Sequence, residues 1–458
     1  MPSEKFRRRL YGEVEQWRKE GLIDTSVYKQ LYERYQFAEL ENSARNRFVL
    51  ILLSLGSILL GLGIITFVAA NWQAWSRELK VILLLSVFVG LNAVGFYLWR
   101  SPTQRWQRHL GKGLLLAGAL ALGANLALMS QLFHQSSPLY QLFLAWGLGV
   151  LAMAYSLRLT LLGTLAIFFT GIGYVLGQGQ AEFLDLGEFF WLRQIMEYMP
   201  VLAGLMFIPL AYWCHSRWIF RLAILLMVYS LEASLISLNL LRSPAWLAGI
   251  ACALPPALLW AYNDSLWGKI VSIDESFKDT ARTLAITFLS LTLYLLSFYR
   301  LWDISSIPLT TGISSLPWSS LVNILILGCF TIWAWLQLWQ RWDRKTSFVA
   351  SMIALAALIP YWHLSTVRLT VEAVLIFNLL LLILAAGLVQ EGLAQGKRRL
   401  FWGGMVLLTL QIFTRMLEYQ TDLLLKSLVL LLCGCGVIAA GLWFERYVRR
   451  RDAKLSRQ

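Results

Sequence analysis

The sequence predicts an all-α integral membrane protein, a bundle of about fourteen transmembrane helices with both termini in the cytosol and a small N-terminal helical hairpin. Three observations predict this fold. First, 58% of the 458 residues are hydrophobic and 14% are charged, whereas soluble domains contain about 25% charged residues. Second, long apolar stretches follow one another from residue 48 to residue 444. Third, Lys and Arg are distributed unevenly among the polar segments between those stretches.

The first 47 residues differ from the rest because they contain many charges and no long apolar run. Apolar residues from Phe6 to Trp17 recur at the spacing of one helix face, and Gly21 ends this helix. A second amphipathic helix follows, which predicts a hairpin. The hairpin either packs on the membrane domain or docks a protein partner. The predicted domains are the cytosolic hairpin (1–47), the transmembrane domain (48–444) and a basic cytosolic tail (445–458).

The transmembrane domain consists of apolar stretches close to the length that crosses about 30 Å of hydrocarbon. The predicted spans are 48–70, 79–98, 113–133, 139–157, 159–178, 198–214, 218–241, 245–262, 284–299, 319–340, 346–362, 370–390, 400–415 and 423–444. The polar segments between them are short. No loop is therefore long enough to hold a separate catalytic domain.

The basic residues orient these spans. With the N-terminus in the cytosol, 32 of the 40 Lys and Arg residues fall on the cytosolic side, as the positive-inside rule requires. The other eight are Arg77, Lys80, Arg193, Arg242, Arg300, Arg368, Arg415 and Lys426. The formal net charge of +14 therefore needs no nucleic-acid partner. Membrane lipids are the expected partners, and the arginines after the last span fit an anionic lipid surface.

One ionisable residue stands in the middle of a predicted span, where charged groups are costly and usually functional or paired. This residue is Glu232 in span 218–241. Tyr229 and Asn239 lie three residues before it and seven after it, on the same helix face. The three residues form a candidate proton or substrate pathway. The alternative is a neutral, hydrogen-bonded carboxyl that fixes helix packing.

Two further patterns suggest a pathway. In span 284–299, Thr287, Ser290 and Tyr294 continue a polar stripe along one helix face, which lines a pathway or packs closely against another helix. In span 245–262, Pro255 and Pro256 interrupt the helix near its middle. Secondary transporters build their binding sites at such breaks, although structural kinks are frequent.

Catalytic motifs are absent from the sequence. It contains no Walker A motif, no His-Glu-x-x-His and no nucleophile elbow. The five cysteines lie in or beside apolar runs without a Cys-x-x-Cys pair, and the four histidines are scattered. We therefore expect no cofactor, no metal site and no catalytic residue.

Two segments resemble one known family. The first is Trp17-x-x-x-Gly21-Leu22-Ile23, and the second runs from Gly123 to His134 with Trp146 after it. Both are similar to the domain of unknown function 2157 family of bacterial polytopic membrane proteins, mainly over residues 10–160. The resemblance implies a multi-pass protein of the bacterial inner membrane and supplies no activity. It draws attention to three polar residues of the second segment, Asn125, Gln131 and His134, which either bind a ligand or cap the helix end.

These features favour a permease- or flippase-like transporter of unassigned substrate. One alternative is a non-catalytic membrane scaffold or assembly factor that docks partners through its N-terminal hairpin. Another is an enzyme that acts on a lipid-linked substrate, which would need the acidic residues of the loop around residues 182–197.

Overall fold

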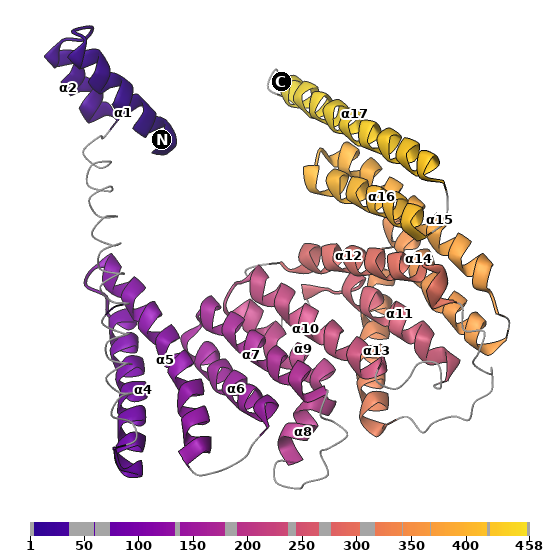
Figure 1. Cartoon of the computed structure of the whole chain (residues 1–458), viewed down its shortest axis with the longest axis horizontal. Coiled ribbons are helices and arrows are strands. Elements are labelled where there is room, and N and C mark those ends of the chain that lie inside the picture. The colour runs from indigo at the N-terminus through magenta and orange to yellow at the C-terminus, as the bar shows by residue number, and fades with distance from the viewer. Residues whose placement is uncertain are drawn as a thin grey trace. The chain divides into compact units, whose positions relative to one another are not determined.

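The computed structural model describes residues 4–35, 59, 74–132, 138–178, 190–236, 244–264, 276–302, 317–340, 342–366, 368–418 and 422–455. All regular structure within these residues is helical (Figure 1). The chain divides into two compact units, Met1–Val87 and Phe88–Gln458.

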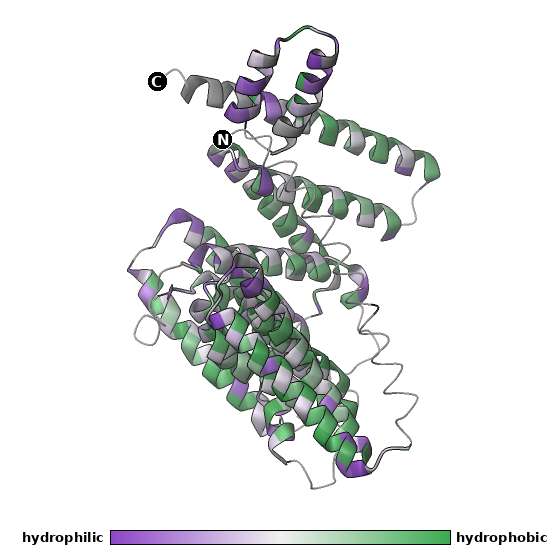
Figure 2. Ribbon diagram, turned by 90° about the vertical axis from the view of Figure 1, so that its left-hand side faces the viewer, coloured by the Kyte–Doolittle hydropathy of each residue, from purple (hydrophilic) through white to green (hydrophobic). Residues whose placement is uncertain are grey.

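The first unit contains a pair of short helices, α1 (Glu4–Lys19) and α2 (Thr25–Arg34). Gly21 lies between them with a φ of +72°, a backbone conformation that glycine adopts without strain. Val14 is fully buried and packs against apolar and aromatic side chains of both helices. Among these neighbours is Tyr28, whose ring also lies 4.6 Å from the Arg18 guanidinium. The pair is more hydrophilic than the long helices that follow it (Figure 2).

The remaining helices are much more apolar. In chain order they are α4 (Arg77–Arg100), α5 (Arg105–Leu132), α6 (Leu139–Leu157), α7 (Thr160–Gln178), α8 (Phe190–Glu197), α9 (Met199–Trp213), α10 (Arg217–Ile236), α11 (Ala245–Trp260), α12 (Lys278–Leu296), the 3-10 helix η3 (Tyr299–Leu301), α13 (Trp318–Trp339), α14 (Arg344–Ser365), α15 (Thr370–Gln395), α16 (Arg398–Glu418) and α17 (Leu423–Leu455).

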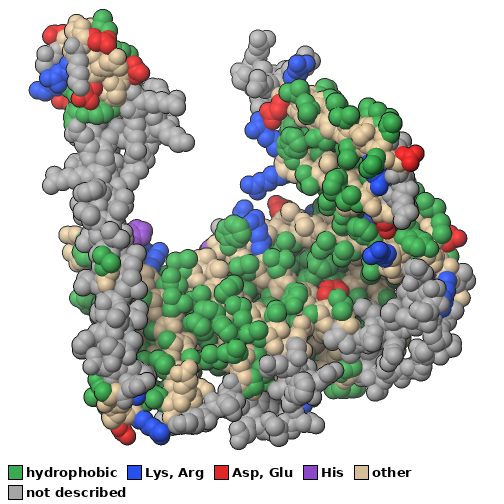
Figure 3. All heavy atoms as spheres, viewed as in Figure 1, with side chains coloured by type: hydrophobic (Ala, Val, Ile, Leu, Met, Phe, Trp, Pro, Cys, Tyr) green, Lys and Arg blue, Asp and Glu red, His purple; other side chains and the backbone are tan. Residues whose placement is uncertain are grey.

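Ten helices of the described chain are long and apolar enough to cross a membrane: α4, α5, α6, α7, α10, α13, α14, α15, α16 and α17. An eleventh candidate is the pair α8 and α9, which meets at a bend of 87°. The prediction of an all-α protein with multiple membrane-spanning helices is confirmed. Hydrophobic side chains also cover much of the face shown in Figure 3, as lipid-facing surfaces require.

The predicted spans agree closely with most of these helices. Span 139–157 coincides with α6, and span 370–390 lies inside α15. Span 48–70 falls almost wholly outside the described residues. The predicted interruption of span 245–262 is wrong, because α11 continues through Pro255 and Pro256. The fixed φ of proline is compatible with helical backbone, so its cost here is two missing hydrogen bonds.

Neighbouring helices of the second unit pack mainly as antiparallel pairs, notably α6 with α7, α9 with α10, and α15 with α16. Close approach of α5 to α6 depends on Gly123, because a Cβ atom there would lie 2.2 Å from the ring of Trp146. The Trp146 ring stacks on Phe169 with centroids 3.7 Å apart, and its Nε1 donates to the Ala119 carbonyl (2.8 Å). Trp146 is thus held between α5 and α7.

Gly123→Ala should lower the free energy of unfolding by about 1–3 kcal/mol, because the added methyl group overpacks the Trp146 contact. The measurement is denaturant or thermal unfolding of the purified protein in detergent. Gly113→Ala on the same helix is the matched control, since a Cβ atom there would meet no atom of the described chain within 4 Å. Equal destabilisation by the two substitutions would contradict the role of the contact.

Candidate functional site

The strongest candidate site centres on Glu232 in the C-terminal half of α10. This helix packs against α7, α9, α11, α12 and α13. In these six helices every other charged side chain stands within the first five residues of α10 or α12. Glu232 is therefore the one charged group of these helices placed deep among apolar neighbours, as the sequence predicts.

The carboxyl group of Glu232 is poorly satisfied. Its Oε1 atom is buried and has no hydrogen-bond partner among the residues that the structure describes. Helix α10, which carries this carboxyl, packs against α11. Because an unpaired charge in an apolar medium is costly, this geometry favours a carboxyl that binds a proton or a cation.

The backbone of α11 beside Cys252 also lacks hydrogen bonds. In an α-helix each N–H donates to the carbonyl four residues before it. Proline has no N–H, so Pro255 leaves the Ala251 carbonyl, and Pro256 the Cys252 carbonyl, without its helical donor. Two carbonyl groups of α11 therefore lack the N–H donor that they would have in a helix without proline.

The structure describes one of the other two members of the predicted triad. Tyr229 is 46% exposed, and its ring meets the edge of Tyr174 on α7 at 6.2 Å. The Tyr174 hydroxyl donates to the Ser230 carbonyl (3.0 Å) and so ties α7 to α10. Asn239 lies outside the described residues.

The polar stripe of α12 lies away from the most deeply buried face of this helix, although Tyr294 packs against the core. The buried residues of this helix are Ala281, Ala285, Leu289 and Leu293, on the face opposite to the stripe. Thr287 is exposed, whereas Ser290 and Tyr294 are half-buried. The hydroxyls of Thr287 and Ser290 donate to carbonyls of their own helix, those of Thr283 (2.9 Å) and Ile286 (2.8 Å).

The structure describes two of the three polar residues singled out in the second family-like segment. Asn125 is buried in α5, where its Nδ2 donates to the Ala121 carbonyl (2.7 Å). Its Oδ1 is buried and has no hydrogen-bond partner within the described chain. Gln131 is exposed near the end of α5, and His134 lies outside the described residues.

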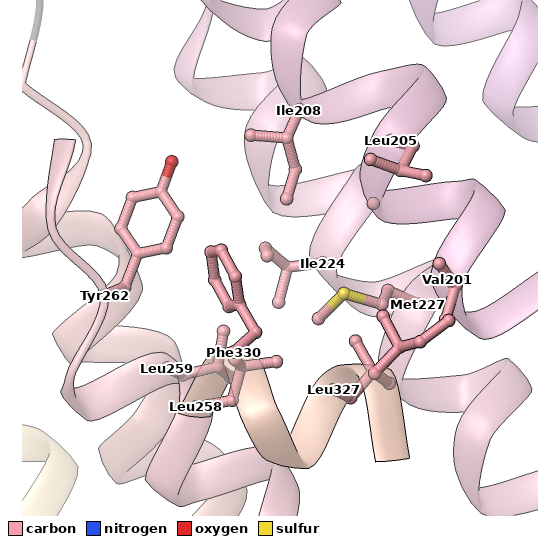
Figure 4. A pocket seen from close by; sticks show the side chains of 12 residues that line it. Val201, Leu205, Ile208, Ile224, Met227, Leu258, Leu259, Tyr262, Leu327 and Phe330 are labelled. Carbon is pink, nitrogen blue, oxygen red and sulfur yellow. The ribbon is translucent and has the colours of Figure 1, made fainter. Parts of the chain in front are cut away.

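A cavity of about 90 Å³ lies among α9, α10, α11 and α13 (Figure 4). Its walls are apolar side chains such as Val201, Met227 and Phe330, with Tyr262 at one side. The Tyr262 hydroxyl already forms a hydrogen bond with the Tyr212 hydroxyl (2.8 Å). The cavity therefore suits hydrocarbon and offers no second site for an ion.

Sequence reasoning missed a polar cluster centred on Asp264, just after α11. The carboxylate of this buried residue accepts hydrogen bonds from the hydroxyls of Tyr212 (2.5 Å) and Ser276 (2.6 Å). It also accepts from the backbone N–H groups of Phe277 (3.0 Å) and Lys278 (3.4 Å), at the start of α12. An anionic acceptor there compensates unpaired N–H groups of a helix terminus. The signal in the sequence that could have indicated this cluster was an acidic residue directly after a predicted span.

A second cluster joins α12, α15 and α16. Arg415 is buried, forms an ion pair with Glu418, and donates from Nη1 to the Ser297 carbonyl (2.7 Å). Asn378 donates to the same carbonyl (3.1 Å), and Glu418 accepts from the Tyr299 N–H (2.8 Å). These side chains satisfy main-chain groups where the chain leaves α12.

The fold and the intramembrane carboxyl define a class, that of multi-pass helical membrane proteins. Within that class, the model of a family described as "Predicted membrane protein (DUF2157)" matches residues 15–163. This match confirms the resemblance over that segment, which includes Asn125, Gln131 and His134 and ends before Glu232. No curated protein and no solved structure matches the chain significantly.

Proposed function

We propose that this protein is a permease- or flippase-like membrane transporter in which Glu232 binds the coupling ion. The observation that supports the proposal best is a carboxylate oxygen buried among apolar helices with no hydrogen-bond partner in the described chain. Intramembrane ionisable groups commonly mark ion pathways and proton relays. Pro255 and Pro256 also free two carbonyl groups of α11, a helix that packs against α10.

We also propose the finer topology that the sequence predicts. The chain then crosses the bacterial inner membrane fourteen times, with both termini in the cytoplasm. Helices α9, α11 and α12 lie at predicted span positions and would bring the ten long helices to thirteen spans; the fourteenth, 48–70, lies almost wholly outside the described residues. The distribution of Lys and Arg supports the orientation, with 32 of 40 on the cytoplasmic side.

Glu232→Gln should reduce proton entry into proteoliposomes to the rate of protein-free liposomes, because the amide cannot take up and release a proton. The measurement is the fluorescence of entrapped pyranine after a potassium diffusion potential, set with valinomycin, drives protons inward. Glu372→Gln is the matched control, since this carboxyl is exposed in the first turn of α15, and it should retain the wild-type rate. An unchanged rate in Glu232→Gln would remove Glu232 from the mechanism.

A further inference from the structure

We propose that a groove between α11, α13 and α14 binds one acyl chain of a membrane phospholipid, with the lipid headgroup at the end that carries Trp246 and Tyr361. The groove has a volume of about 410 Å³. It shares no lining residue with the cavity of Figure 4. The proposal goes beyond the proposed function and does not depend on it.

Small residues create the space in this groove. Helices α13 and α14 both pack against α11, whose lining residues Gly249, Ala253 and Ala257 follow one another at intervals of four along one helix face. From α13, Gly328 lines the groove, and a Cβ atom there would meet no atom of the described chain within 4 Å. Ile332 also lines it and is 63% exposed, so the groove opens onto the surface of the protein.

The chemistry of the lining selects hydrocarbon as the occupant. Between the two aromatic residues and the other end of the groove, Thr331 is the one polar side chain of the lining. Its hydroxyl already donates to the Leu327 carbonyl (2.7 Å). A polar or charged ligand would therefore lose its hydration without gaining a partner, which is costly. The medium around a multi-pass membrane protein supplies hydrocarbon instead.

The length of the groove matches one leaflet of the bilayer. From Trp246 to Ala257, α11 rises about 16 Å at 1.5 Å per residue, and one leaflet supplies about half of the roughly 30 Å of hydrocarbon. At the far end Trp335 bridges α13 to α11, because its Nε1 donates to the Ala257 carbonyl (3.0 Å). An acyl chain fits this length, whereas a membrane-spanning helix of a partner would need a surface across the full bilayer.

The other end of the groove suits a lipid headgroup. Trp246 lies at the start of α11 and Tyr361 near the end of α14, and they are 38% and 40% exposed. These two residue types are enriched where membrane meets water. The indole N–H and the phenolic O–H can donate hydrogen bonds to phosphate or ester oxygens of the lipid. In the proposed topology, this end belongs to the periplasmic leaflet.

The test is photo-crosslinking of the purified full-length protein in nanodiscs of phosphatidylethanolamine and phosphatidylglycerol. A trace of phosphatidylcholine carries a diazirine at the end of one acyl chain, and mass spectrometry of the digested protein locates the label. Lipid that merely surrounds the protein is measured on α17, whose most apolar segment is 6% buried. We expect the peptides with Ala257 and Thr331 to carry more label than α17.

Gly328→Trp fills the groove and should reduce the label on these two peptides to the level of α17. Gly403→Trp on α16 is the matched control, since a Cβ atom there also meets no atom of the described chain within 4 Å, and it should be labelled as the wild type is. Circular dichroism and gel filtration check folding, and Gly328→Leu is the smaller substitution to use if Gly328→Trp does not fold.

Three results would overturn the proposal. The first is equal labelling of the groove peptides and α17 in the wild type. The second is unchanged labelling when the groove is filled, or an equal loss in Gly403→Trp. The third is weaker labelling of the groove than of α17, which would indicate that a second copy of the chain or another protein covers the groove. None of these results depends on Glu232, so they leave the proposed function to its own test.

Discussion

Arg415→Met is expected to lower the free energy of unfolding by about 3–5 kcal/mol, the cost of removing one partner of a buried ion pair. The guanidinium is 9% exposed, pairs with Glu418 and donates to the Ser297 carbonyl. Methionine fills similar space, so the loss is mainly electrostatic. The carboxylate of Glu418, whose side chain is 16% exposed, is left without its cation. Denaturant unfolding in detergent micelles measures the change.

A double-mutant cycle separates the ion pair from the packing. Glu418→Gln keeps an acceptor for the Tyr299 N–H but removes the negative charge. The double variant Arg415→Met/Glu418→Gln should therefore be more stable than the sum of the single effects predicts, by about 0.5–3 kcal/mol. Lys345, whose ion pair with Glu391 is largely exposed, provides the control, and Lys345→Met should change stability by less than about 1 kcal/mol. Simple additivity at Arg415 and Glu418 would contradict the coupling.

Asp264→Ala is the second substitution with a large expected effect, a loss of about 3 kcal/mol or more. Alanine leaves two hydroxyl donors and two backbone N–H groups without their acceptor, and each hydrogen bond to a charged group contributes about 1.5–3 kcal/mol. Because some of these donors can rebind water, the loss is smaller than the sum. Thermal and denaturant unfolding of the purified protein test the prediction.

Two control variants test whether the destabilisation by Asp264→Ala arises from the contacts at the start of α12. Tyr262→Phe removes the hydrogen bond between the Tyr262 and Tyr212 hydroxyls but leaves the Asp264 carboxylate in place, and should cost about 1 kcal/mol. Asp279→Ala removes a carboxylate from the first turn of the same helix, where its interaction with the helix dipole contributes about 0.3–1 kcal/mol. If Asp264→Ala destabilised the protein no more than these two variants, the cluster would not anchor the helix.

Much of the fold is predictable from the sequence because the pattern of residues within each helix is enough to indicate that helix. An apolar stretch of sufficient length predicts a span from its own residues, which explains why span 139–157 and α6 agree at both ends. Gly21 marks the end of α1 for the same reason, since a positive φ is a local requirement. The Arg415–Glu418 pair was also predictable, because residues three apart on a helix are neighbours.

Contacts between helices cannot be predicted from such local patterns. The periodicity of α12 shows that Thr287 and Tyr294 share a face, but it does not show that the opposite face is buried. Similarly, Tyr212 lies 52 residues before Asp264, and no local pattern indicates that they meet. The surroundings of Glu232 likewise depend on how α10 packs against the neighbouring helices. Helix periodicity therefore identified Glu232 but not the residues around it.

The short length of α11 has a consequence for the lipid around it. Its 16 residues extend about 24 Å at 1.5 Å per residue, which is less than the roughly 30 Å of bilayer hydrocarbon. When a helix is shorter than the hydrocarbon layer, the mismatch is relieved because the bilayer thins around the helix. In the proposed topology, an ion that passes beside α11 would then cross a thinner dielectric barrier than one beside the long helices.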